Sequence, residues 1–184
     1  MKNRHNASVS KVAGFITPQN LSLGAYQGDF PLYQSISRVN QSECRLPIYI
    51  GKAAPSGRRT GQSETAGQTL YSRLREHTQS ITRGGLSVKD FKFKVVAMEV
   101  DLVSWGEGVL IRLFVPVWNR FISGFGIHAP GGGREQQERS MWDQLHPGRK
   151  FAERLPINNP LDKGALSERV NTHCRNMTRI LGYK

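Results

Sequence analysis

This sequence of 184 residues has little cysteine, no long apolar run and a shortage of acidic side chains. Its two cysteines, Cys44 and Cys174, lie far apart and lack Cys-x-x-Cys spacing, so they do not form a zinc site by themselves. The run Val12–Ile16 is too short for the core of a signal peptide. No stretch approaches the roughly 18 apolar residues of a membrane span. We therefore expect a cytoplasmic protein with reduced cysteines and no membrane segment.

The shortage of acidic side chains leaves a strongly positive chain. Lysine and arginine number 26 against 14 aspartate and glutamate residues, which gives a net charge of +12 and an isoelectric point near 10.2. Such a field attracts polyanions, and nucleic acid is the commonest partner of a basic chain. A ribosomal or merely basic protein is the alternative. The length and the hydrophobic fraction of 38% suit one domain with appended segments.

Hydrophobic periodicity predicts an α+β fold, in which a small central sheet is flanked by helices and followed by extra C-terminal helices. Residues 1–20 are polar and aperiodic, which is typical of an arm. We expect a core at 21–155 with inserted loops, and a helical extension at 156–184. The patterns predict strands at Leu46–Lys52 and Phe91–Glu99, and helices at Thr69–Arg83, Ser104–Phe114, Arg134–Leu145 and Asp162–Leu181.

Arg73 and His77 stand four residues apart in a predicted helix, so their side chains leave the same face. The planar fork of arginine can hold two phosphate oxygens at once, and histidine can carry a proton near neutral pH. The apolar stripe Leu70, Leu74 and Ile81 is expected to fix this helix to the core, with the pair beside the stripe. Taken in isolation, the pair is also compatible with a solvated basic face.

Glu107 has two interpretations that the sequence leaves open. Ser104-x-x-Glu107 has the form of a capping box, in which the glutamate bonds back to the start of its own helix. The same residue is the only carboxylate in the apolar segment 102–117. One or two carboxylates with phosphate oxygens and water are the usual ligands of Mg²⁺, so Glu107 is also a candidate metal ligand.

Asn119 follows the helix stop at Pro116, where asparagine is commonly a turn residue. The glycine-rich stretch Phe121–Arg134 can bring backbone amides close to a phosphate, or can be a flexible surface loop. It lacks the Gly-Lys-Ser/Thr ending of a P-loop, so we expect no nucleotide cofactor. The histidines show no close metal-ligand spacing, which argues against a zinc site.

Taken in order, these residues resemble the core of the GIY-YIG nucleases, and most of all the type II restriction endonucleases of that family. The likeness covers residues 24–155, and its passages are Pro47–Pro55 with Tyr49-Ile50-Gly51, Ser72–His77, Pro116–Asn119, and Gly124–Arg149 with its ending His146-Pro147-Gly148-Arg149. The resemblance implies Mg²⁺-dependent cleavage of double-stranded DNA at a short palindromic site. It also implies a homodimer and a place in a restriction-modification system.

The resemblance also implies roles for single residues. Tyr49 would lie at the catalytic centre, Arg73 would clamp the scissile phosphate and His77 would assist proton transfer. Glu107 would bind the metal, and Asn119 would help to position the centre.

Further contacts with DNA are expected from basic residues. Lys52, directly after the strand, should lie near the phosphate. Arg58, Arg59 and Arg134 stand on glycine-bearing segments and are candidate DNA contacts, because arginine binds guanine edges as well as phosphates.

One departure from the family pattern concerns the first half of its signature. Gly-Ile-Tyr is absent as spelled, and the nearest match is Gly24-Ala25-Tyr26, so Tyr26 is our candidate for the general-base tyrosine. The register of the following segment instead aligns the family's tyrosine with Ser22. If that register holds, His77 does more of the work, or the chain is a basic DNA-binding protein on a nuclease-derived fold with lost or impaired cleavage.

Overall fold

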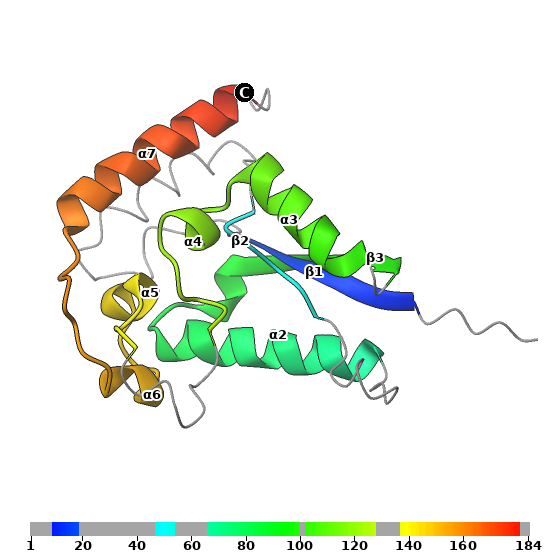
Figure 1. Cartoon of the computed structure of the whole chain (residues 1–184), viewed down its shortest axis with the longest axis horizontal. Coiled ribbons are helices and arrows are strands. Elements are labelled where there is room, and N and C mark those ends of the chain that lie inside the picture. Colours follow the sequence, from blue (N-terminus) through cyan, green and yellow to red (C-terminus); the bar gives the residue numbers. More distant parts are fainter. Residues whose placement is uncertain (1–8, 19–46, 54–65, 100–101, 128–136, 181–184) are drawn as a thin grey trace, which may run out of the picture.

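The computed structural model describes residues 9–18, 47–53, 66–99, 102–127 and 137–180 (Figure 1). Its centre is a three-stranded antiparallel sheet of β1 (Val9–Pro18), β2 (Tyr49–Gly51) and β3 (Phe91–Glu99), in the order β2-β1-β3. Strand β3 has the bounds predicted from its alternating residues. The predicted apolar face of β3 is only partly covered, because Phe91 packs against the core while Phe93 and Val95 are exposed.

The central strand is the element that sequence patterns missed. Residues 1–20 were expected to form an arm, but Val9–Pro18 pairs with β2 on one edge and with β3 on the other. Its register sets Gly14 opposite Gly51, and Ile16 opposite Tyr49. Hydrogen bonds to two neighbouring strands hold this segment extended. The segment's own sequence has no alternating hydrophobic pattern that would predict this pairing. The predicted boundary at residue 20 therefore does not separate an arm from the core.

Two long helices lie on either side of the sheet and both contact β1: α2 (Ala66–Arg83) and α3 (Val103–Phe114) (Figure 1). Both confirm predicted helices. Helix α2 stops at the two glycines that follow it, where Gly85 adopts a φ of 77°, and a short 3₁₀ turn, η2 (Val88–Asp90), leads into β3. Helix α3 ends at Val115, whose φ of 44° turns the chain before Pro116.

The C-terminal part contains shorter helices than the sequence predicted. They are α4 (Val117–Arg120), α5 (Met141–Leu145) and α6 (Lys150–Glu153), and they precede the long helix α7 (Lys163–Ile180). The helix predicted from Arg134 begins only at Met141. Ser140 caps it, because its Oγ accepts a hydrogen bond from the amide of Asp143 at 3.1 Å. Residues 137–140 are not helical, and 134–136 lie outside the described residues.

The core divides at the sheet because successive residues of β2 point to opposite faces. Tyr49 belongs to the larger cluster, which contains Trp118, Phe125 and Trp142, whereas Ile50 packs with α3. Helix α7 contributes buried residues to the larger cluster, namely Leu166, Val170 and Cys174. The helical segment predicted as a C-terminal extension is thus packed into the same core. Among the described residues, no helix is both long and apolar enough to cross a membrane.

Candidate functional site

Tyr49 lies at the centre of the site, with its phenol between two glycines. A Cβ atom added to Gly51 would lie 2.6 Å from the Tyr49 hydroxyl, and one added to Gly126 would also collide with it. Burial raises the pKa of Tyr49, and the nearby Arg73 guanidinium only partly offsets that effect. The phenol is therefore protonated at neutral pH.

Helix α2 supplies the two side chains that surround this phenol. His77 lies on the buried stripe of the helix with an exposed fraction of 7%, where its ring stacks on Phe125 at 4.8 Å and meets Tyr49 edge-on at 5.2 Å. Arg73 hydrogen-bonds to the Tyr49 hydroxyl, and its Nη2 donates to the carbonyl oxygen of Gly126 at 2.9 Å. The pair is thus packed against its neighbours, and the solvated-face interpretation is wrong.

Helix α3, on the other face of the sheet (Figure 1), brings Glu107 close enough to Tyr49 to affect its pKa. Its Oε2 lies 3.5 Å from Lys52 Nζ, which also donates to Ser104 Oγ at 3.0 Å. The charge of Glu107 contributes to the raised pKa of Tyr49, although burial contributes more. Helix α3 begins at Val103, so Ser104 stands inside it, and the residue at the N-cap makes no side-chain capping bond. The capping-box interpretation of Glu107 is therefore wrong.

Asn119 lies in helix α4, not in a turn, and it holds the strand that carries Tyr49. Its Oδ1 accepts from the amide of Ile50 at 2.8 Å, and its Nδ2 donates to the carbonyl oxygen of Ile50 at 2.8 Å. The amide of Trp118 donates to the carbonyl oxygen of Ile48 at 2.8 Å. Asn119 therefore acts on the backbone of β2, as a neighbouring strand would, and fixes the position of Tyr49.

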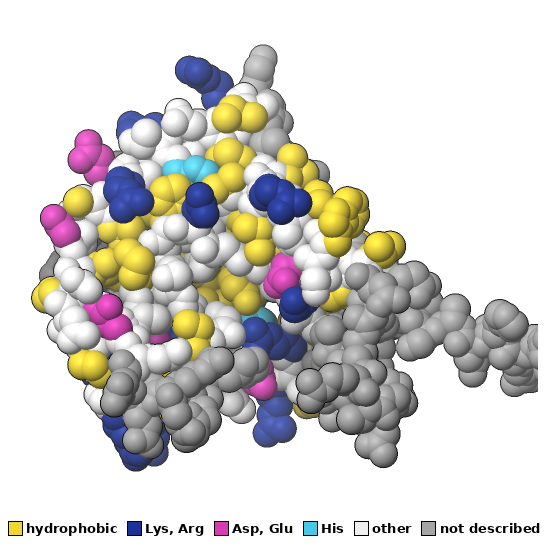
Figure 2. Space-filling view, in the orientation of Figure 1, with side chains coloured by type: hydrophobic (Ala, Val, Ile, Leu, Met, Phe, Trp, Pro, Cys, Tyr) yellow, Lys and Arg dark blue, Asp and Glu magenta, His cyan; other side chains and the backbone are white. Residues whose placement is uncertain are grey.

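A cavity of about 340 Å³ adjoins Arg73 and His77. It lies between α2 and the segment Gly124–Ile127, and Arg83 and Arg149 also line it. In Figure 2, basic, acidic and histidine side chains come together near the middle of the face, in the region between α3 and α2. The hollow is therefore open and lined by three arginines, with the carboxylate of Glu76 beside Arg73.

Several predicted residues lie outside the part of the chain that the structure describes. They are Tyr26, Arg58, Arg59 and Arg134. The structure brings together the remaining predicted site residues, which are Tyr49, Lys52, Arg73, His77 and Glu107, and it places Asn119 behind them.

Four residues support this arrangement in ways that sequence reasoning did not predict; Phe125 and Gly126 were expected only as part of a glycine-rich stretch whose backbone amides could approach a phosphate. Phe125 and Gly126 contact the side chains of the site, and Arg149 with Asp143 holds the segment that carries them. A signal was present for Asp143, because Ser140-x-x-Asp143 is a capping pattern. Arg149 had been noted only as part of His146-Pro147-Gly148-Arg149, and nothing in its sequence context indicates burial.

The donors at this site fit one hard divalent cation. Within the described residues, no cluster of three or more histidine, cysteine, aspartate or glutamate side chains could hold a metal ion. Glu107 offers one carboxylate beside Lys52, with a side-chain exposure of 23%. One carboxylate, completed by substrate phosphate oxygens and water, is a common arrangement for Mg²⁺.

The comparison with protein families agrees with this geometry. The model of the Eco29kI GIY-YIG domain matches residues 23–174. This range includes β2, the two long helices α2 and α3 that flank the sheet, and most of α7. A search of curated proteins found no match. Because the match spans most of the chain, this protein belongs to the Eco29kI family of GIY-YIG restriction endonucleases, which are DNA-cutting nucleases of α+β fold.

Proposed function

We propose that this protein is a Mg²⁺-dependent restriction endonuclease that hydrolyses both strands of DNA at a short palindromic site, acting as a homodimer. One observation carries the proposal. A protonated phenol, a guanidinium, an ammonium and a carboxylate converge from β2, α2 and α3, and the guanidinium also lines an open hollow. Those are the groups that a phosphodiester needs for charge neutralisation and for proton transfer.

Arg73 and Tyr49 are proposed to bind the scissile phosphate. Arg73 is held by the Gly126 carbonyl oxygen, by the Tyr49 hydroxyl and by Glu76, whose Oε2 accepts from Arg73 Nη1 at 3.1 Å. These contacts limit the directions in which the guanidinium can point. Because the Tyr49 oxygen accepts from Arg73 and the phenol keeps its proton, the hydroxyl can donate to a phosphate oxygen. A positioned donor of this kind acts without reorganising during the reaction.

Glu107 is proposed as the metal ligand, and Lys52 as its neighbour on the phosphate. Mg²⁺ bound there would supply the positive charge that neutralises the phosphate in the transition state. In the structure Lys52 offsets the charge of Glu107, and its side chain is 42% exposed, so it can also reach an incoming phosphate. Arg58, Arg59 and Arg134 remain our proposed contacts to DNA beyond the site.

His77 is proposed to assist proton transfer, and Asn119 to position the centre through β2. The ring of His77 contacts the Tyr49 ring, so a side chain that can carry a proton near neutral pH lies beside the phenol. Tyr26 remains our candidate for the general base.

The test is digestion of phage DNA of known sequence by the purified protein, with Mg²⁺ and with EDTA. We expect discrete fragments only with Mg²⁺, and sequenced fragment ends that share one symmetric motif. Salt-dependent binding without cutting under either condition would overturn the proposal in favour of a DNA-binding protein on a nuclease-derived fold. Random nicks would overturn the proposed site specificity and the palindrome with it.

A further inference from the structure

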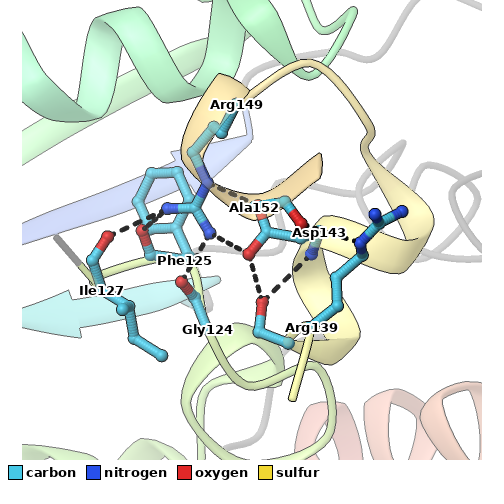
Figure 3. Close-up of polar contacts among 8 residues, drawn as sticks. Gly124, Phe125, Ile127, Arg139, Asp143, Arg149 and Ala152 are labelled. Atoms are coloured by element: carbon cyan, nitrogen blue, oxygen red, sulfur yellow. Dashed lines mark hydrogen bonds and ion pairs between the residues drawn. The ribbon is translucent and has the colours of Figure 1, made fainter. Parts of the chain in front are cut away.

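The most completely bonded side chain in the described part of the molecule is Arg149, which is 3% exposed (Figure 3). Its Nε and Nη2 bind the two carboxylate oxygens of Asp143 at 2.6 and 2.7 Å, in a fork-to-fork pair. Asp143 is equally buried, and Ser140 Oγ donates to it at 2.6 Å. The guanidinium also lies over the ring of Trp142, 4.7 Å from its centroid. Its orientation is therefore fixed from several sides.

The remaining donors of Arg149 hold one short segment of the chain, Gly124–Ile127. Its Nη2 donates to the carbonyl oxygen of Gly124 at 2.9 Å, and its Nη1 donates to those of Phe125 and Ile127 at 3.1 Å each (Figure 3). Three carbonyl groups within four residues thus converge on a single guanidinium. A segment of this kind has no helix or sheet to define its conformation, so these bonds define it.

The one carbonyl oxygen of this segment that does not bind Arg149 faces the site. That carbonyl belongs to Gly126, and it accepts from Arg73 Nη2 at 2.9 Å. The ring of the preceding residue, Phe125, stacks on His77 with an interplanar angle of 18° and meets Tyr49 edge-on at 4.9 Å. One face of Gly124–Ile127 therefore binds Arg149, and the other face contacts three side chains of the candidate active site.

We propose that Arg149 is a positioning residue for the nuclease reaction: by fixing the conformation of Gly124–Ile127, it sets the directions of Arg73 and His77. The inference rests on the proposed function. Charge alone does not suffice for this role. A lysine could pair with Asp143, but its three donors cannot serve a carboxylate and three carbonyl groups together, whereas the arginine fork uses all five of its N–H groups.

The experiment compares Arg149→Lys with a matched control, Arg139→Lys. Arg139 also binds two backbone carbonyl groups, those of Ala152 and Glu153, but it makes no contact with Gly124–Ile127 that the structure records. For each protein we would measure the single-turnover cleavage rate with Mg²⁺, the Kd for DNA without Mg²⁺, the thermal midpoint, and the NMR signals of the histidine rings. The His77 signal is assigned from its loss in His77→Gln.

For Arg149→Lys we expect the single-turnover rate to fall about 10- to 100-fold, because misplacement of about 1 Å at a reacting centre has that effect. The Kd for DNA should stay within about threefold, because binding depends mainly on the basic surface. The His77 signal should move, since the ring of Phe125 no longer stacks in the same way. Arg139→Lys should leave both the rate and the His77 signal as in the wild type.

A wild-type rate in folded Arg149→Lys would overturn the inference, and so would an equal loss in both variants. If Arg149→Lys does not fold, Asp143→Asn decides, since it removes the carboxylate charge that orients the guanidinium toward the three carbonyl groups and leaves Arg149 itself in place. In that variant, a lowered rate with a shifted His77 signal supports the inference, and wild-type values of both overturn it. If the wild type itself does not cut DNA, the proposed function fails. The His77 signal still tests the positioning, because it does not depend on activity.

Discussion

At the scale of single residues, the candidate site depends on two glycines, Gly51 and Gly126, because a side chain at either position would collide with Tyr49. The phenol of Tyr49 extends along β2 over Gly51 and reaches the turn at Gly126, and a methyl group at either glycine would occupy the space of the ring or its hydroxyl. The glycine of Tyr49-Ile50-Gly51 is thus needed for the path of the tyrosine side chain. Lys52, one residue later, leaves the opposite face of the strand and meets Glu107.

Glu107→Gln tests the proposed metal ligand. Because the carboxylate is the only acidic group of the described residues that faces Lys52, the amide should abolish cleavage, with a loss of about 10³-fold or more. DNA binding without Mg²⁺ should remain, since it depends on the net charge of +12. The measurements are single-turnover cleavage, a binding titration and the thermal midpoint.

The control for this variant is Glu168→Gln, which makes the same change of charge at an exposed position on α7. It should cut like the wild type. Full activity of Glu107→Gln in Mg²⁺ would contradict the assignment. A large drop in its thermal midpoint would instead indicate a role of Glu107 in folding.

At the scale of elements, helix α2 is positioned from its C-terminal end. Gly84 packs directly against Trp142 and His146, where a Cβ atom would lie 2.8 and 2.9 Å from their side chains. Gly148 adopts a φ of 136° and lies against the backbone of Arg83. The segment that follows α5 therefore clamps the end of α2, and the middle of α2 carries Arg73 and His77.

His146 makes this clamp sensitive to pH. The side chain is fully buried, and burial lowers its pKa from 6.5 to about 4, against the opposing effects of a Gly84 backbone hydrogen bond and the Asp143 charge. A folded-state pKa below the unfolded one means that stability is complete above pH 6.5 and is lost as the pH falls towards 4. The loss between pH 7 and pH 4 should be about 3 kcal/mol.

The measurement is urea unfolding of the wild type and of His146→Asn across this pH range. Asparagine can still hydrogen-bond but does not titrate, so the variant should show a flatter pH dependence, whatever its stability at pH 7. His173→Asn is the comparison, because His173 is only half-buried and should account for a smaller share. Equal pH dependence in the wild type and His146→Asn would exclude the buried histidine as the cause.

The elements that could be predicted from sequence are those whose own residues show a regular hydrophobic period. Helix α2 shows Leu70, Leu74 and Ile81 on one stripe, and β3 alternates from Phe91 onwards. Strand β1 and the short helices α4 to α6 carry no such period. Partners distant in the sequence stabilise β1 through its two neighbouring strands, and α4 and α5 through the contact between the buried rings of Trp118 and Trp142.

The same distinction applies to the site. The candidate site residues could be proposed from sequence, because their types and order suit phosphate chemistry and resemble a known family. The supporting contacts were not predictable, since the bonds of Arg149 to three carbonyl groups depend on how distant segments meet. His77 was placed beside the apolar stripe but lies within it, because an imidazole can fill an apolar position when aromatic rings surround it.

At the scale of the whole molecule, the described part of one chain brings together one candidate catalytic set from β2, α2 and α3, and a double-strand break requires two cuts. Two copies related by a two-fold axis would place one such set on each strand of a symmetric site. The proposed dimer therefore predicts that the cuts on the two strands are coupled. This prediction can be tested without locating the dimer interface.

Mixed dimers give that test. Wild-type protein would be mixed with an excess of Glu107→Gln, the subunits allowed to exchange, and a supercoiled plasmid with a single recognition site digested. If the enzyme is a dimer with one catalytic set per strand, most active molecules then hold one competent subunit, and nicked circles should accumulate in place of linear DNA. If monomers cut each strand independently, the excess variant would slow both cuts by competing for the site, and the ratio of nicked to linear DNA at equal turnover would match that of wild-type protein alone.

An excess of Glu107→Gln/Arg73→Ala, with two of its proposed catalytic groups removed, should give the same nicking, because the strand cut by the wild-type subunit depends only on that subunit's own residues.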